Sequence, residues 1–321
     1  MSISMLAHKQ AFHIRRRHLV LLFFAAIAVY VLLPQLGDFR TSWQLLRHPE
    51  APITAAAVLL TAGTYIAGAG TYCFLAFRPL SFGRTLLVQF AAMFVNRLLP
   101  AGIGAVGANY LYLRHAKHTA SQAVSVVALN NLLGLVGHAL LLLAAISFFS
   151  DDSFTLFSEH AASWSHMVEF VVVAIAALII LSLVFGRHKM KKAWQDIRIQ
   201  LSGYQRRPLS LAGALCTSVT LTLCNMLALF CCLLALGVSL PFTAVLMVFT
   251  FGVSVGAAVP TPGGLGGFEA GLAAGFVAYG VDPASALAAA LLYRLISYWL
   301  PLLGGALAFI ISQKYKLFSV F

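Results

Sequence analysis

Four ionisable residues lie inside long apolar stretches of the sequence: Arg97, Glu169, Glu269 and Arg294. A charged side chain is costly at the centre of a bilayer unless it is paired or hydrated, so such residues are candidate site residues. Glu269 and Arg294 are predicted to meet near the membrane midplane, where the planar guanidinium of Arg294 suits a phosphate group. Arg97 immediately precedes an interruption of its apolar stretch, whereas Glu169 is predicted to lie at the outer interface.

Two apolar stretches, 82 to 115 and 242 to 280, are interrupted by proline and several glycines. These residues remove backbone hydrogen bonds and helical continuity, so each stretch is predicted to form two half-helices around a break. Irregular backbone persists at membrane depth only inside protein or beside a water-filled cavity. The half-helix N-termini that follow the breaks would attract an anionic group. The residues predicted to form these two re-entrant loops are Pro100, Gly102 and Gly104 in the first, and Pro262, Gly263, Gly264, Gly266 and Gly267 in the second.

The two interrupted stretches resemble each other at an offset of 162 residues, which places PAGIGA from Pro100 over PGGLGG from Pro262. The long stretch that begins near Thr119 then lies over the one that begins near Val281. Each half of the chain therefore has a broken segment followed by a long span. Inverted repeats with discontinuous helices are typical of alternating-access transporters.

Two further residues, Asn131 and Tyr298, are predicted to line the site with Arg97, Glu269 and Arg294. Asn131 falls close to Arg294 at the repeat offset, and Tyr298 lies one helical turn after it. Structural alternatives stay open: interhelical hydrogen bonding for Asn131, lipid contact for Tyr298, and an ion pair of Arg294 with Glu269 that only locks helices together.

Composition excludes a soluble protein, because hydrophobic residues make up 61% of the chain and charged residues only 9%, against about 45–50% and 25% in soluble domains. The fold class predicted is an all-α polytopic membrane protein with about six full crossings and two broken re-entrant segments arranged as an inverted repeat. The full crossings are predicted at 19 to 36, 51 to 76, 119 to 149, 165 to 186, 209 to 237 and 283 to 312.

The distribution of lysine and arginine predicts the orientation. Seventeen of them lie in the termini and loops that this arrangement places in the cytoplasm, and only Arg40 and Arg47 lie in the opposite loops. This asymmetry predicts that both termini are cytoplasmic, and it holds only if each broken segment enters and leaves on the same side. The net charge of +12 is thereby explained without nucleic-acid binding.

The chain is predicted to be one integral membrane domain, 1 to 321. Within it we distinguish a first half-repeat at 37 to 149, a basic cytoplasmic loop at 187 to 208 and a second half-repeat at 209 to 321. Gly267, Gly271 and Gly275 form a ridge of small residues suited to close helix packing or to self-association. No nucleotide-binding, metalloprotease or serine-hydrolase motif occurs, so no catalytic residue, metal or cofactor is predicted.

With these residues identified, the chain resembles the lysylphosphatidylglycerol synthase transmembrane-region family. The strongest blocks are PGGLGGFEA from Pro262 and ALLYRLISYWLP ending at Pro301, with PAGIG from Pro100 as a weaker counterpart. The resemblance covers most of the chain. It departs at Asn130-Asn131, where many family members have an acidic/basic pair, and this departure weakens any carry-over of headgroup specificity.

The resemblance implies a flippase that moves a charged phospholipid, such as an aminoacylated phosphatidylglycerol, between the leaflets of a bacterial inner membrane. The bifunctional family members carry a soluble aminoacyl-transferase domain after the membrane part; this sequence ends without one, so enzymatic activity is not expected. The partners implied are a phospholipid substrate, a second copy of the chain or a lipid-synthesising enzyme. Two alternatives stay open: an ion-coupled transporter of a small soluble solute, and a non-catalytic membrane partner in lipid modification.

Overall fold

The computed structural model describes residues 39–99, 103–148, 203–204, 207–259 and 261–318. Within these ranges every regular element is a helix. Four helical runs are long and apolar enough to cross a membrane, among them α3 (Ala51–Leu75), α6 (Ala120–Phe148) and α10 (Pro208–Ala235). The fourth runs from Pro283 to Lys314. The predicted helical membrane fold is therefore confirmed, whereas the crossings predicted at 19 to 36 and 165 to 186 lie outside the described residues.

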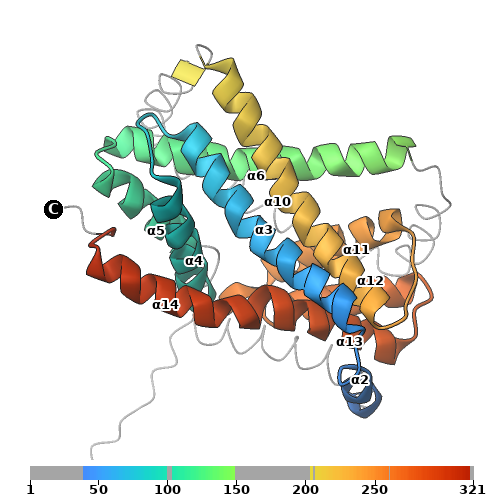
Figure 1. The fold of residues 1–321 in the computed structure, drawn as a ribbon. Coiled ribbons are helices and arrows are strands. Elements are labelled where there is room, and N and C mark those ends of the chain that lie inside the picture. Colours follow the sequence, from blue (N-terminus) through green and yellow to red (C-terminus); the bar gives the residue numbers. More distant parts are fainter. Residues whose placement is uncertain (1–38, 100–102, 149–202, 205–206, 260, 319–321) are drawn as a thin grey trace, which may run out of the picture.

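The long helices α3 and α10 pack side by side through small residues (Figure 1). A Cβ added to Gly70 of α3 would lie 3.1 Å from the Thr217 side chain of α10, and one added to Gly63 would lie 3.5 Å from the Cys224 sulfur. Small side chains let two helix backbones approach closely, which is how helices associate without a hydrophobic driving force in lipid. The pair forms the central element of the molecule.

The fourth run consists of α13 (Pro283–Arg294), a π-helical turn η4 (Leu295–Trp299) and α14 (Leu300–Lys314). It begins at Asp282, whose carboxylate caps the helix by accepting a hydrogen bond from the Ser285 N–H at 3.1 Å, an N-cap geometry that stabilises helix starts. It packs against α4 (Phe82–Leu98), since a Cβ on Gly305 would lie 2.9 Å from the Phe90 carbonyl oxygen. This contact brings the last turn of α4 beside η4.

The first interrupted segment forms a helical hairpin of α4 and α5 (Ile103–His115). Near its tip, a Cβ added to Gly104 would lie 2.6 Å from the Cα of Asn96. Further from the tip, the Gln89 amide donates to the Asn109 side-chain oxygen at 2.9 Å. A later residue of α5 thus contacts an earlier residue of α4, so the two helices are antiparallel. The chain therefore returns toward the end of the molecule at which α4 began.

The second interrupted segment forms the same kind of hairpin from α11 (Phe242–Ala258) and α12 (Gly267–Ala278). Gly271 packs against Gly252, with 3.0 Å between an added Cβ and the Gly252 Cα, and Gly275 packs against Val248 at 2.9 Å. The predicted packing role of this glycine ridge is therefore confirmed. Both glycines are buried inside the hairpin, which leaves no part of the ridge between them for self-association.

Corresponding residues face each other in the two hairpins to within one position. At the sequence offset of 162 residues, the contact of Gln89 with Asn109 corresponds to positions 251 and 271, and the observed contact is Gly252 with Gly271. The agreement to one residue supports the internal repeat predicted from the sequence. The seams differ in chemistry, because hydrogen-bonded amides join the first hairpin and glycines join the second.

Three glycines turn the chain at the tip of the second hairpin. The 3₁₀ turn η3 (Pro262–Gly264) leads into Gly266, and the φ angles of Gly263, Gly264 and Gly266 are 63°, 67° and 85°. Glycine adopts this left-handed region without steric cost, which other residues cannot do. The predicted break at Pro262 is therefore observed, while Pro100 and Gly102 lie outside the described residues.

We predict that Gly104→Ala destabilises the protein by about 1–3 kcal/mol, the usual cost of overpacking a tight contact. The added methyl group would meet α4 backbone atoms, which cannot move aside as a flexible side chain can. Gly107→Ala, in the same helix, is the matched control, because an added Cβ there has nothing within 4 Å. The apparent melting temperature of purified protein in detergent measures the difference; equal melting of the two variants would contradict the packing described.

A second prediction concerns His118, which lies in the turn between α5 and α6. Its Nε2 accepts the Arg78 backbone N–H at 3.2 Å and its Nδ1 faces the Leu113 carbonyl oxygen at 3.1 Å. A carbonyl oxygen only accepts, so Nδ1 carries the hydrogen and the ring is neutral. Burial lowers the pKa of His118, and the Arg78 charge lowers it further.

The pKa of His118 in the folded protein lies below the ordinary histidine value of about 6.5. Neutral His118 therefore contributes its full stabilisation above about pH 6.5. This contribution is lost as the pH falls toward the folded-state pKa, since the unfolded chain then binds the proton more readily. We expect wild-type melting temperature to fall between pH 7.5 and pH 5.5, and the fall to be smaller in His118→Gln. Parallel pH profiles for the two proteins would contradict the neutral histidine.

Candidate functional site

A buried ion pair joins the tip of the second hairpin to α13. Arg294 Nε lies 2.5 Å from Glu269 Oε1, and both residues are more than nine-tenths buried. Glu269 is the third residue of α12, and its other oxygen accepts the Gly266 N–H at 2.8 Å. Arg294 also donates to the Gly263 carbonyl oxygen at 2.9 Å. The pair thus satisfies two backbone groups that the break leaves without helical partners.

Aromatic rings enclose the Arg294 guanidinium. Its central carbon lies 4.9 Å from the centroid of Phe268 and 4.7 Å from that of Tyr298. A cation within about 6 Å of a ring face is attracted by the ring quadrupole. The rings also exclude water, so the ion pair lies in a medium of low dielectric constant, where charge interactions are strong.

Arg97, in the last turn of α4, reaches the same place from the first half of the chain. Its Nη2 donates to the Ser297 carbonyl oxygen at 2.6 Å and to the Tyr65 hydroxyl at 3.3 Å. Its central carbon lies 4.8 Å from the Tyr298 ring centroid. The residue is only 5% exposed, and its Nη1 has no hydrogen-bond partner.

Pro301 removes the usual α-helical donor of the Ser297 carbonyl oxygen. In an α-helix this oxygen would receive the N–H of the residue four positions later, but proline has no N–H. The same proline follows the π-helical turn η4, in which the Leu300 N–H bonds to the Leu295 carbonyl oxygen five residues back. Single π-helical turns are frequent at functional sites, and here a carbonyl oxygen of the turn accepts from Arg97.

Tyr298 connects the two halves, because both guanidinium groups lie against its ring. A Cβ at Gly263 would overlap this ring, so the glycine permits the close approach of the hairpin tip as well as its turn. Arg97, Arg294, Glu269 and Tyr298 form what we call the arginine cluster. Its formal charges are two positive and one negative.

The structure therefore brings together four of the five side chains predicted to bind substrate. Asn131 lies apart, on an exposed face of α6, where its side-chain oxygen accepts from Asn130 at 3.5 Å. Among the predicted loop residues, Gly264 packs on Gly256 and Gly267 on Val255 and Val259. Glu169 lies outside the described residues.

Sequence reasoning missed three groups that contact the cluster: the Tyr65 hydroxyl, the Ser297 carbonyl oxygen and the Phe268 ring. Tyr65 lies within a continuous helix with no interruption near it, so no local pattern singles it out. Ser297 has a usable signal, since a proline four residues after it removes the α-helical donor of its carbonyl oxygen.

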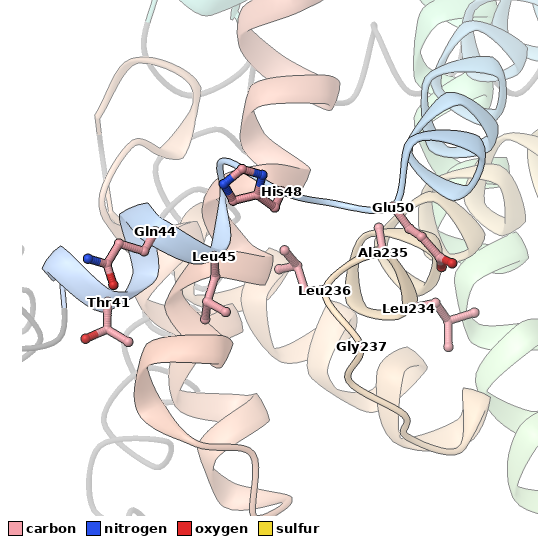
Figure 2. A pocket seen from close by; sticks show the side chains of 9 residues that line it. All are labelled: Thr41, Gln44, Leu45, His48, Glu50, Leu234, Ala235, Leu236 and Gly237. Atoms are coloured by element: carbon pink, nitrogen blue, oxygen red, sulfur yellow. The ribbon is translucent and has the colours of Figure 1, made fainter.

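An open cavity of about 550 Å³ lies elsewhere, where α2 (Phe39–Leu45) and the start of α3 meet the end of α10 (Figure 2). It shares no residue with the arginine cluster. The lining contains no lysine or arginine, and it includes the carboxylate of Glu50. The lining residues are Thr41, Gln44, Leu45, His48, Glu50, Leu234, Ala235, Leu236 and Gly237.

Comparison with known proteins relates the chain to a membrane-protein family and to an archaeal membrane protein. A family model described as the lysylphosphatidylglycerol synthase transmembrane region matches residues 13–305. A UPF0104 membrane protein of Methanothermobacter thermautotrophicus is 37% identical over 81 residues, which are 25% of this chain and 24% of that protein. The matched part thus spans about a quarter of that relative's length.

The ion pair predicts strong coupling between Glu269 and Arg294. We expect Glu269→Gln to destabilise the protein by about 3–5 kcal/mol, because it leaves a buried guanidinium without its counter-charge. The double variant Glu269→Gln/Arg294→Gln should lose less than the sum of the two single losses. Melting temperatures in detergent of wild type, both single variants and the double variant measure this coupling. If the two single losses of stability add up to the loss in the double variant, the two side chains do not interact.

Proposed function

Because the chain belongs to the lysylphosphatidylglycerol synthase transmembrane-region family, we propose that this multi-pass membrane protein is a lipid flippase. Its substrate in this proposal is an anionic or aminoacylated phospholipid, or a related lipid-linked headgroup. The membrane is a bacterial inner membrane with both chain termini on the cytoplasmic side. The proposal includes no catalytic step for this chain.

The observation that carries the proposal is the arginine cluster. Two guanidinium groups, one from each half of the chain, lie buried against one aromatic ring, and the single carboxylate of the cluster is paired with Arg294. Excess positive charge inside an apolar protein is costly. A phosphate group that enters the cluster offsets this charge and accepts the directional hydrogen bonds that arginine donates.

The two hairpins support transport rather than static binding. Each returns toward the end of the molecule at which it began, as a re-entrant segment does, and the positive-inside distribution then places their openings on opposite faces of the membrane. Elements related by an inverted repeat can exchange conformations, so that a site between them faces first one side and then the other. The arginine cluster lies where the second hairpin tip meets the end of α4.

Exposed apolar side chains favour a lipid over a soluble solute. Leu295 and Trp299 flank the buried Tyr298 along the chain and are 55% and 49% exposed, and Leu303 is 75% exposed one turn later. This surface suits acyl chains, so a lipid headgroup can occupy the cluster while its tails remain in the bilayer. A soluble solute would require a polar route at the same place.

Reconstitution tests the proposed function. Vesicles with phosphatidylglycerol labelled on its headgroup are exposed to a membrane-impermeant quencher, and the rate at which inner-leaflet label becomes accessible is measured. We expect wild-type protein to raise this rate above that of protein-free vesicles. Arg294→Gln should lower it about tenfold or more, because the loss of one partner of a buried ion pair leaves Glu269 uncompensated and releases the hairpin tip on which the cluster depends.

The matched control is Lys314→Gln, which removes one positive charge from the exposed end of the same helical run. Its rate should equal that of wild type. Lysyl-phosphatidylglycerol and phosphatidylcholine, labelled in parallel, report headgroup preference. Wild-type vesicles no faster than protein-free vesicles for any of these lipids would contradict the flippase assignment.

A further inference from the structure

The two arginines of the cluster differ in how their charge is balanced. Arg294 has a carboxylate at 2.5 Å and a backbone carbonyl at 2.9 Å. The described acceptors of Arg97 are both neutral, the Ser297 carbonyl oxygen and the Tyr65 hydroxyl. Among the residues that the structure describes, no carboxylate forms an ion pair with Arg97. The excess positive charge of the cluster therefore lies on Arg97.

We propose that Arg97 is the residue that binds the phosphate of the substrate headgroup, and that Arg294 is a positioning residue that holds the hairpin tip in place. The choice of a lipid as the source of the phosphate rests on the proposed function. The anion site itself rests on the geometry of Arg97.

Burial makes the uncompensated charge of Arg97 informative. Neutral oxygens and an aromatic ring solvate a guanidinium, but they do not neutralise it, and a buried cation normally has a counter-anion. Buried polar atoms without a partner are rare in native structures and each requires an explanation. The Arg97 Nη1 atom is such an atom, and an anion supplied from outside the chain accounts for both features.

The donors around Arg97 suit a phosphate. Its unpartnered Nη1 offers N–H groups, and a guanidinium fork binds two phosphate oxygens at once. The Tyr65 hydroxyl accepts from Arg97 Nη2, so the hydroxyl hydrogen remains to donate to a further phosphate oxygen. A phosphodiester with one negative charge would thus balance the charge of Arg97 and bind two kinds of donor.

The position of Arg97 suits a phosphate attached to acyl chains. Leu98 and Leu99 follow it directly and are 59% and 43% exposed, while Ile103 at the start of α5 is 62% exposed. A buried cation thus lies next in sequence to an apolar surface. An inorganic phosphate would gain nothing from this surface, whereas a phospholipid buries its tails there.

Binding measurements on the full chain test the division of roles. The ratio of affinities for phosphatidylglycerol and phosphatidylcholine is measured in nanodiscs by displacement of a labelled lipid. We expect a ratio of about ten or more for wild type, the scale of one charge-assisted hydrogen bond. Arg97→Gln should bring the ratio close to one, and Arg97→Lys, which keeps the charge without the fork, should give an intermediate ratio.

Arg84→Gln is the matched control, because it removes an exposed arginine from the same helix, and its ratio should equal that of wild type. Glu269→Gln/Arg294→Gln tests the positioning role: its net charge is unchanged, and it should keep a ratio well above one while it melts at lower temperature. If the affinity ratio falls to one in this double variant but stays at the wild-type value in Arg97→Gln, the assignment of Arg97 as the phosphate-binding residue is wrong. Equal ratios in Arg97→Gln and Arg84→Gln would also overturn it.

Two further results separate this inference from the proposed function. Wild-type protein that shows the Arg97-dependent ratio but moves no lipid in vesicles would contradict transport and support the anion site. Inorganic phosphate serves as the second ligand, measured in detergent by its effect on melting temperature. Suppose that inorganic phosphate raises the melting temperature of wild type but not of Arg97→Gln, and that wild type binds phosphatidylglycerol no more tightly than phosphatidylcholine. This result would overturn the choice of a lipid as the source of the phosphate.

Discussion

The ion pair of Glu269 with Arg294 holds together the part of the structure that helices alone could not build. A bilayer offers no water to backbone groups, so each N–H and carbonyl freed by a break must find a partner inside the protein. One oxygen of Glu269 binds the Gly266 N–H, and Arg294 binds the Gly263 carbonyl oxygen. The glycine turn, the hairpin tip and the attachment of α12 to α13 all depend on this pair.

The same contact determines how the halves meet. Because Arg294 fixes the hairpin tip, Gly263 lies against the Tyr298 ring, and the ring is then in place for Arg97 to approach from α4. The close packing of Gly305 on α4 keeps that approach short. The cluster is thus a product of both hairpins and of the long helical run between them, and neither half contains it alone.

Much of this arrangement could be predicted from the sequence, because its strongest signals are physical. Proline and glycine in an apolar stretch predict a break wherever they occur, and both interrupted segments are pairs of helices. Charges in apolar stretches are few, so Arg97, Glu269 and Arg294 were the natural candidates, and they do lie together. At the offset of 162 residues, the facing positions of the two hairpins agree to within one residue.

Other features depend on tertiary contacts that no local pattern reports. Asn131 is polar and aligns with Tyr293, next to Arg294, at the repeat offset, yet it lies on an exposed face of α6, since a helix position alone does not determine which neighbour covers it. Tyr65 joins the cluster only because α3 packs there. The different balance of charge on Arg97 and Arg294 likewise appears only when distances are known.

The missing N–H of Pro301 ties together two positions that are 204 residues apart. Any other amino acid at position 301 would bring an N–H that an α-helix directs at the Ser297 carbonyl oxygen, so Arg97 would share this acceptor with the backbone. Conversely, a chain without Arg97 would lose one donor to this oxygen, and the proline could not replace it. The two positions therefore act on one carbonyl oxygen, one by supplying a donor and the other by lacking one.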